Sequence, residues 1–191
     1  MLTGIIMCGG QSSRMGKDKG LLIKDGQCWA MHGVQKLEKA GLPVKLSVNP
    51  SQKKEYQKIF SQHDLIEDKI DLPGPAAGLC SAYIALGTDL LLLACDMTDV
   101  SVQSIRQLIH HYEQEKDHYD FFVFKNNEAL EPLFGIYSAA GIQKIHQQWQ
   151  DGTLDRFSMK YLLEQGKVFA IAVEESQEKE FRNYNSPLDI V

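Results

Sequence analysis

Short apolar runs alternate with segments of helical periodicity along the whole chain. The predicted strands are Leu2–Met7, Val44–Val48, Leu65–Glu67, Asp89–Ala94, Phe121–Phe124, Leu133–Tyr137 and Val168–Val173. The predicted helices are Trp29–Ala40, Gln52–Phe60, Leu79–Leu86, Ser101–Glu115, Ala139–Trp149 and Ser158–Gln165. Strands that alternate with helices predict an α/β fold, with a mostly parallel sheet covered by helices on both faces.

Two segments carry most of this prediction. The run Asp89–Ala94 reads Asp-Leu-Leu-Leu-Leu-Ala, and such a continuous apolar stretch is typical of a central parallel strand. The cluster Leu72–Gly78 contains two prolines and two glycines, which predicts a loop. No long linker divides the chain, so we expect residues 1–191 to form a single domain.

Composition and charge exclude several classes of protein. With 43% hydrophobic residues the chain can bury a sizeable core, and no apolar run approaches the about 20 residues that span a membrane. The amino terminus lacks the basic segment of a signal peptide, so we expect a cytoplasmic protein. The net charge of −5 argues against a nucleic-acid-binding protein.

The cysteines indicate neither a zinc site nor a disulfide framework. No two of them have the C-x-x-C spacing, and all four lie far apart: Cys8, Cys28, Cys80 and Cys95. This distribution is consistent with a reducing compartment.

The most informative chemical feature is a glycine-rich, cationic segment directly after the first predicted strand. Residues 9–19 read Gly-Gly-Gln-Ser-Ser-Arg-Met-Gly-Lys-Asp-Lys. Glycines let backbone N–H groups approach a polyphosphate closely, and Arg14, Lys17 and Lys19 supply charged donors for phosphate oxygens. The segment therefore predicts a nucleotide-binding loop at the carboxyl end of the first strand.

Two common phosphate-binding motifs do not match this loop. A Walker A loop requires a glycine where the chain has Gln11 and a serine or threonine where it has Asp18. The dinucleotide fingerprint G-x-G-x-x-G is also not supplied by Gly9 to Arg14.

Asp96 follows the predicted central strand, at the position where open α/β sheets bind their ligands. A carboxylate there can hold Mg²⁺, which uses one or two carboxylates together with substrate phosphates and waters. The alternative is a turn or helix-capping aspartate. The neighbouring glycine-rich loop favours the metal site.

The loop pattern G-G-x-S-x-R-M-G-x-D-K resembles the signature of nucleotidyltransferases, and specifically the molybdenum cofactor guanylyltransferase (MobA) family. Five further segments resemble this family in the same order: Asn49 at a strand end, Asp68 with Pro73–Gly78, Ala94–Met97, Glu131–Tyr137 and Phe181–Asp189. The resemblance implies a three-layer α/β/α sandwich with a Rossmann-like nucleotidyltransferase fold. It also implies Mg²⁺-dependent transfer of GMP from GTP to the terminal phosphate of molybdopterin.

The resemblance assigns roles to individual residues. It implies that the nucleotide is contacted by Cys8, Gly9, Gly10, Arg14, Lys19, Asn49, Asp68, Gly78 and Asp96. Among these, Arg14 and Lys19 would bind the triphosphate, Asn49 and Asp68 the base or ribose, and Asp96 the Mg²⁺. Arg14, Lys19 and Asp96 would be the catalytic residues. Asn185 would complete the metal site, and the acceptor would contact Arg156, Lys160 and Asn183.

Some of these residues have structural alternatives. Asn49-Pro50 is also a turn signal, Asp68 could be a solvated loop charge, and Arg156 with Lys160 could be ordinary surface charges. By the same resemblance, the nucleotide is bound by the N-terminal part of the domain and the acceptor by the C-terminal part. Transient contact with other molybdenum cofactor proteins is expected, and neither nucleic acid nor membrane is expected as a partner.

The chain also departs from the family pattern. Cys8 replaces a small residue of the loop, and Ala94 and Thr98 replace two prolines around Asp96 in the family's P-C-D-x-P segment. These departures leave the choice of base open. A related enzyme that uses CTP or another small phosphate acceptor remains an alternative, as does a non-catalytic GTP-binding protein.

Overall fold

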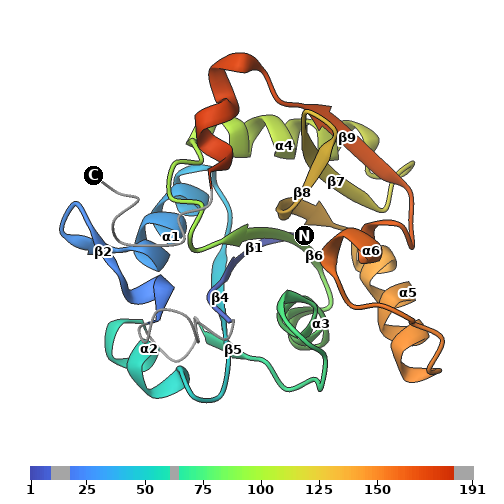
Figure 1. Ribbon diagram of the computed structural model, residues 1–191, viewed down its shortest axis with the longest axis horizontal. Helices are drawn as coiled ribbons and strands as arrows, with labels where there is room; N and C mark the ends of the chain where they lie inside the picture. Colours follow the sequence, from blue (N-terminus) through green and yellow to red (C-terminus); the bar gives the residue numbers. More distant parts are fainter. Residues whose placement is uncertain (10–17, 61–64, 183–191) are drawn as a thin grey trace.

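The computed structural model describes residues 1–9, 18–60 and 65–182. Within these residues a seven-stranded sheet has the order β5-β4-β1-β6-β8-β7-β9 (Figure 1). All neighbouring strands pair in parallel except those that flank β8, which runs antiparallel to both. The strands are β1 (Leu2–Met7), β4 (Val44–Val48), β5 (Leu65–Glu67), β6 (Asp89–Ala94), β7 (Phe121–Asn126), β8 (Ala129–Tyr137) and β9 (Val168–Ala172).

Helices cover both faces of this sheet (Figure 1). One face packs against α1 (Trp29–Lys39), α2 (Lys53–Ile59), α4 (Val102–Glu115) and the 3-10 helix η3 (Glu175–Phe181). The other face packs against α3 (Pro75–Leu86), α5 (Ala139–Gln150) and α6 (Met159–Leu163). The predicted three-layer α/β/α sandwich is therefore confirmed.

The middle strand β6 explains how the two hydrophobic cores are joined. Its four leucines, Leu90–Leu93, are at most 1% exposed. Leu91 and Leu93 belong to the core under α1 and α4, whereas Leu90 and Leu92 belong to the core under α3 and α5. Successive side chains of a strand point to opposite faces, so a strand buried on both faces must be apolar throughout.

The helix α3 begins earlier than the sequence predicted. Its first residue is Pro75, inside the cluster predicted to be a loop. Gly74 is the preceding cap residue with φ of 65°, and proline is favoured in the first turn because its missing N–H needs no partner there. The two strong breaker residues therefore start this helix instead of excluding it.

Three short elements were not predicted. A hairpin joins β2 (Ile23–Lys24) to β3 (Gln27–Cys28) through Asp25 and Gly26, both with positive φ. An Asp-Gly pair is a preferred two-residue hairpin turn, but strands of two residues have no readable periodicity. The 3-10 helix η1 (Lys19–Leu21) precedes the hairpin, and η3 replaces a predicted charged loop.

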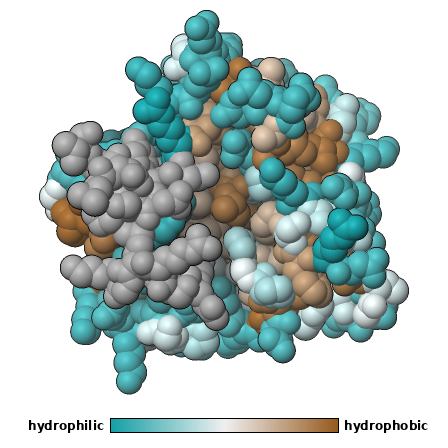
Figure 2. Space-filling view, in the orientation of Figure 1, coloured by the Kyte–Doolittle hydropathy of each residue, from teal (hydrophilic) through white to brown (hydrophobic). Residues whose placement is uncertain are grey.

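The molecular surface in the view of Figure 2 has hydrophobic residues near its centre and mainly hydrophilic residues around its rim. Among the helices of the described residues, none has the length and apolar character needed to cross a membrane.

We expect Leu91→Ala to lower the free energy of unfolding by roughly 2–5 kcal/mol, because it leaves a cavity in the middle of the sheet. The change is measured by urea denaturation followed by circular dichroism. Ile84→Ala, on the 57% exposed side chain of Ile84 in α3, is the control and should change stability little. Equal effects of the two substitutions would contradict the central position of β6.

Candidate functional site

The carboxyl ends of four neighbouring strands meet at one edge of the sheet. Parallel pairing aligns Met7 of β1 with Ser47 of β4 and with Ala94 of β6, and Val48 of β4 with Glu67 of β5. The residues that follow these strand ends therefore lie along one edge: Cys8 and Gly9, Asn49, Asp68 and Asp96. The topology brings together residues that are widely separated in the sequence.

Not every predicted site residue can be placed. Gly10, Arg14, Asn183 and Asn185 lie outside the described residues.

Lys19 and Asp96 form an ion pair at this edge. The Lys19 Nζ lies 3.0 Å from Asp96 Oδ2, and the two side chains are only 24% and 18% exposed. Lys19 comes from η1 at the end of the glycine-rich segment, and Asp96 follows β6. The structure thus places the lysine that is predicted to bind phosphate directly on the carboxylate that is predicted to bind a metal ion.

The backbone beside Lys19 is held by a network around Asp18. One Asp18 carboxylate oxygen accepts hydrogen bonds from the Gly20 N–H and the buried Tyr56 hydroxyl. The other accepts from the Gln52 amide, which also donates to the Cys8 carbonyl oxygen. These contacts connect η1 to α2 and to the end of β1. Sequence reasoning missed Gln52 and Tyr56, because neither belongs to a recognisable motif.

Asp68 packs closely against two glycines. The Ser47 hydroxyl donates a 2.7 Å hydrogen bond to Asp68 Oδ1. A Cβ added to Gly9 would lie 2.5 Å from Asp68 Oδ2, and one added to Gly78 would lie 2.5 Å from Ser47 Oγ. The structure therefore gathers three predicted residues, Gly9, Asp68 and Gly78, around one carboxylate. A side chain at Gly9 would displace the carboxylate itself, and one at Gly78 would displace the Ser47 hydroxyl that donates to it.

Burial raises the pKa of the Asp68 carboxyl to about 6. The hydrogen bond from Ser47 lowers this pKa, and the nearby negative charge of Glu67 raises it. Desolvation disfavours the charged form of a carboxyl group, so the folded protein holds Asp68 at a cost in stability. Perturbed carboxyl groups of this kind are concentrated at functional sites.

Asn49 has a structural role in the described contacts. Its side-chain oxygen accepts hydrogen bonds from the Gln52 N–H and the Ser51 hydroxyl. Its own backbone N–H donates to the Gln52 side chain. These bonds form the turn between β4 and α2, as the Asn-Pro signal indicated. The Asn49 side-chain NH₂ has no part in these three bonds.

Cys8 has a buried thiol, and both its backbone N–H and its backbone carbonyl are hydrogen-bonded. Its N–H donates to the Ser47 carbonyl, and its own carbonyl is bound by Gln52. Burial, followed by the contact with the Cys95 thiol, raises the pKa of the Cys8 thiol. Such a thiol is protonated and behaves as a small apolar group at the end of β1.

Arg156 and Lys160 are exposed and lie near the start of α6. The Arg156 guanidinium carbon lies 5.4 Å from the ring centre of Tyr161. Lys160 lines a cavity of about 350 Å³ together with residues of α6 and of the β7–β8 turn. Burial raises the pKa of Glu131 at the start of β8, and the charge of Lys160 partly offsets this rise.

The described residues contain no group of three or more histidine, cysteine, aspartate or glutamate side chains that could hold a metal ion. Asp96 nevertheless offers an oxygen donor of the type that Mg²⁺ prefers, and that oxygen already accommodates the cationic Lys19 Nζ. A metal ion here would take its other ligands from substrate phosphates, water and residues outside the described ranges.

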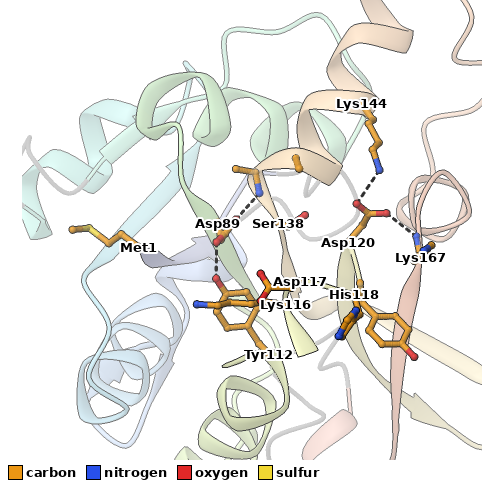
Figure 3. Close-up of a pocket in the computed structure, with 13 residues that line it drawn as sticks. Met1, Asp89, Tyr112, Lys116, Asp117, His118, Asp120, Ser138, Lys144 and Lys167 are labelled. Atoms are coloured by element: carbon orange, nitrogen blue, oxygen red, sulfur yellow. Dashed lines mark hydrogen bonds and ion pairs between the residues drawn. The ribbon is translucent and has the colours of Figure 1, made fainter. Parts of the chain in front are cut away.

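A polar cavity of about 600 Å³ lies at the opposite edge of the sheet (Figure 3). Two of the three aspartates that line it are hydrogen-bonded within the protein. Asp89 accepts from the Tyr112 hydroxyl and the Ala139 N–H, and Asp120 accepts from Lys144 and the Lys167 N–H. Asp89 begins β6 whereas Asp96 follows its end, so this cavity is remote from the Lys19–Asp96 pair.

We expect Asp68→Asn to stabilise the protein in a pH-dependent way. Between about pH 4 and 6 the folded wild type retains a proton that the unfolded chain has released, so wild-type stability falls as pH rises. Asparagine still accepts the Ser47 hydrogen bond and removes this penalty. The gain should therefore grow from pH 4 to 6 and level off above pH 7 at roughly 1–3 kcal/mol.

Urea denaturation of both proteins between pH 4 and 8 measures this gain. Asp117→Asn changes an exposed aspartate at the opposite edge and serves as the control. A gain for Asp68→Asn that is the same at pH 4.5 and pH 8 would show that burial does not raise the Asp68 pKa.

Comparison with known proteins supports the family expected from the motifs. The family model of the MobA-like NTP transferase domain matches residues 4–166. A probable molybdenum cofactor guanylyltransferase of Flavobacterium johnsoniae is 30% identical over 186 residues, which cover 97% of this chain and 92% of that protein.

Two solved structures have a similar fold. Molybdopterin-guanine dinucleotide biosynthesis protein A from Archaeoglobus fulgidus aligns with a TM-score of 0.75 at 21% identity, covering 100% of this chain and 95% of that one. Rv0371c from Mycobacterium tuberculosis, solved in complex with manganese, aligns with a TM-score of 0.59 at 16% identity, covering 90% and 88%. Since the family model spans most of the sequence and the Flavobacterium relative matches nearly all of it, the chain belongs to the MobA-like NTP transferase family.

Proposed function

We propose that this protein transfers GMP from GTP to the terminal phosphate of molybdopterin, giving molybdopterin guanine dinucleotide and pyrophosphate. The observation that carries the proposal is the Lys19–Asp96 pair at the carboxyl edge of the parallel sheet, beside the glycine-rich segment. An oxygen of the acceptor phosphate attacks the α-phosphorus of GTP, and the bond from that phosphorus to the oxygen bridging to the β-phosphate breaks. This chemistry needs positioning and charge neutralisation more than a protein nucleophile.

Asp96 is the proposed ligand of a Mg²⁺ ion, and Asn185 is a proposed second ligand outside the described residues. The ion would neutralise phosphate charge and align the reacting groups when bound. The buried position of β6 supports this role, because a carboxylate directly after a rigid central strand is held in place by the core.

Lys19 is proposed to bind the triphosphate and to stabilise charge on the leaving pyrophosphate, together with Arg14. In the structure the Lys19 ammonium contacts Asp96. On nucleotide binding it exchanges this carboxylate for a phosphate oxygen. The Asp18 network supports this exchange, because it holds the backbone of η1 through contacts that do not involve the Lys19 side chain.

Asp68 is proposed to recognise the nucleoside. An ionised carboxylate accepts hydrogen bonds only, which suits ribose hydroxyls or the N–H groups of guanine. Its close packing against Gly9 and Gly78 supports a site in which the backbone approaches the nucleotide directly. Cys8, Gly10 and Asn49 are proposed to line the same part of the site.

The acceptor is proposed to bind to the C-terminal part of the chain, with Arg156, Lys160 and Asn183 as contacts. The exposed positions of Arg156 and Lys160 leave their charges available to a phosphate. We propose that the reaction takes place in the cytoplasm, where other molybdenum cofactor proteins supply the pterin.

Asp96→Asn tests the proposed metal-binding residue. In the wild type we expect GTP with Mg²⁺ to raise Tm by roughly 5–10 °C at about 100 times Kd, more than CTP, UTP or ATP do. In Asp96→Asn this Mg²⁺-dependent shift should disappear, and kcat for pyrophosphate release with molybdopterin should fall by roughly 100-fold or more. The measurements are differential scanning fluorimetry and a coupled pyrophosphate assay.

Asp117→Asn is the matched control and should behave as the wild type. A Tm shift selective for CTP would contradict guanylyl transfer and indicate cytidylyl transfer instead. Binding of GTP without any transfer to molybdopterin would indicate another acceptor or a non-catalytic protein.

Lys160→Ala tests the acceptor site. Because a lost charge-assisted contact to a phosphate weakens binding, we expect KM for molybdopterin to rise by roughly ten-fold while KM for GTP is unchanged. Steady-state kinetics with each substrate varied in turn measure this difference. Lys116→Ala at the opposite edge is the control, and a parallel rise in both KM values for Lys160→Ala would exclude a role restricted to the acceptor.

A further inference from the structure

The segment after β6 that carries Asp96 is contacted by two lysines from the N-terminal part of the chain. The Lys24 Nζ donates to Thr98 Oγ1 at 3.2 Å and to Asp99 Oδ1 at 2.8 Å. The Lys36 Nζ donates to the Thr98 carbonyl oxygen. Lys24 belongs to β2 and Lys36 to α1, so two different elements hold the same short segment.

The side chains of both lysines are partly buried, so their ammonium groups depend on these protein acceptors. The side chains of Lys24 and Asp99 are 22% and 29% exposed. Burial lowers the pKa of Lys36, and the charge of Asp99 opposes this effect. A partly buried ammonium group requires acceptors in fixed positions, because it has lost part of its hydration.

The backbone around Lys24 is also anchored. The carbonyl oxygen of Lys24 lies 2.7 Å from His32 Nε2, a residue of α1. The Trp29 N–H at the start of α1 donates to the Leu22 carbonyl. These bonds dock the β2–β3 hairpin on α1, which in turn packs on the sheet through Val34 and Leu37. Lys24 therefore projects from a supported position.

The stretch from Lys19 to Lys24 meets the stretch from Asp96 to Asp99 at both of its ends. Lys19 pairs with Asp96, and Lys24 pairs with Asp99. The second pair still joins the two stretches when Lys19 leaves Asp96 for a phosphate. The Lys24–Asp99 pair thus limits how far Lys19, which is proposed to bind the triphosphate, can lie from Asp96, which is proposed to bind the metal ion.

Thr98 supplies two hydrogen-bond acceptors, its hydroxyl and its carbonyl oxygen, whereas a proline would supply the carbonyl oxygen alone. It stands where the P-C-D-x-P segment has its second proline, and its hydroxyl receives Lys24 while its carbonyl receives Lys36. A proline would restrict the backbone at this position through its ring. In this chain, polar contacts to Lys24 and Lys36 restrain the same position.

We propose that Lys24 and Lys36 are positioning residues that hold the segment Asp96–Asp99 and so set the geometry of Asp96 relative to Lys19. This inference rests on the proposed function, in which Asp96 binds the metal ion. It concerns residues to which the proposed function assigns no contact with the nucleotide or the reacting phosphates.

The test is a charge exchange between Lys24 and Asp99. We expect Lys24→Asp and Asp99→Lys, made singly, to raise the Kd for Mn²⁺ in the presence of GTP and to lower kcat, each by roughly 10- to 100-fold. The double variant should recover most of both losses, because it restores the pair with opposite polarity. Mn²⁺ binding is measured by electron paramagnetic resonance of the free ion, independently of turnover.

Lys36→Met should raise the Mn²⁺ Kd in the same direction. Lys39→Met is its matched control, because Lys39 is exposed on the same helix, and it should leave binding and kcat unchanged. KM for molybdopterin should stay within about two-fold of the wild-type value in all these variants, since the acceptor contacts are untouched. Lys24→Met replaces Lys24→Asp if circular dichroism shows that the reversed charge prevents folding.

The proposed function and the positioning role of the two lysines are contradicted by different results. If wild-type protein binds no Mn²⁺ in the presence of GTP and transfers no GMP, the proposed function is wrong. If the wild type is active and folded Lys24 and Lys36 variants match it in Mn²⁺ Kd and kcat, the positioning role is overturned. Loss of activity in the single variants without recovery in the double variant would also overturn the role of the Lys24–Asp99 pair.

Discussion

The parallel register of β1 with β4 and β6 is the constraint on which the rest of the structure depends. It aligns the ends of strands from distant parts of the sequence, so that Gly9, Asp68 and Asp96 follow strands that finish at one edge. These strands are held in place by the burial of β6 on both faces, where Leu91 and Leu93 pack under one helical layer and Leu90 and Leu92 under the other. The packing of the hydrophobic core therefore sets the positions of the strand ends that form the candidate site.

Polar contacts then connect the glycine-rich segment to this rigid frame. Asp18 is bound by Gln52 and Tyr56 of the α2 region, while Lys19 and Lys24 contact the segment after β6. Each contact is partly buried, where a charged or polar group is expensive without a partner. The backbone of η1 and the hairpin is consequently held on both sides, whereas the Lys19 ammonium is the group that we propose to bind a phosphate.

Asp68 differs from these residues, because burial disfavours the charged form of its side chain. Burial of its carboxyl group raises the pKa to about 6, so the ionised form lowers the stability of the fold. A residue that served stability alone would be apolar at this position. Its retention beside the proposed nucleotide loop is consistent with a binding role, since functional sites commonly hold groups that the fold would not otherwise favour.

Several features could be predicted because they depend on local sequence. The strands β1, β4, β5 and β6 match their predicted bounds, since apolar runs between turn signals identify short buried strands. The start of α3 and the extension of β8 to Ala129 were missed. The first depends on Gly74 adopting positive φ, and the second on pairing with β7, so neither is set by apolar periodicity. By itself the sequence determined the alternation of strands and helices, the loop chemistry and the family, because these follow from residue types and their order. Only the tertiary structure decided that Lys24, Lys36, Gln52 and Tyr56 contact the segments of the candidate site, because contacts between residues far apart in the sequence arise only when the sheet and helices pack together.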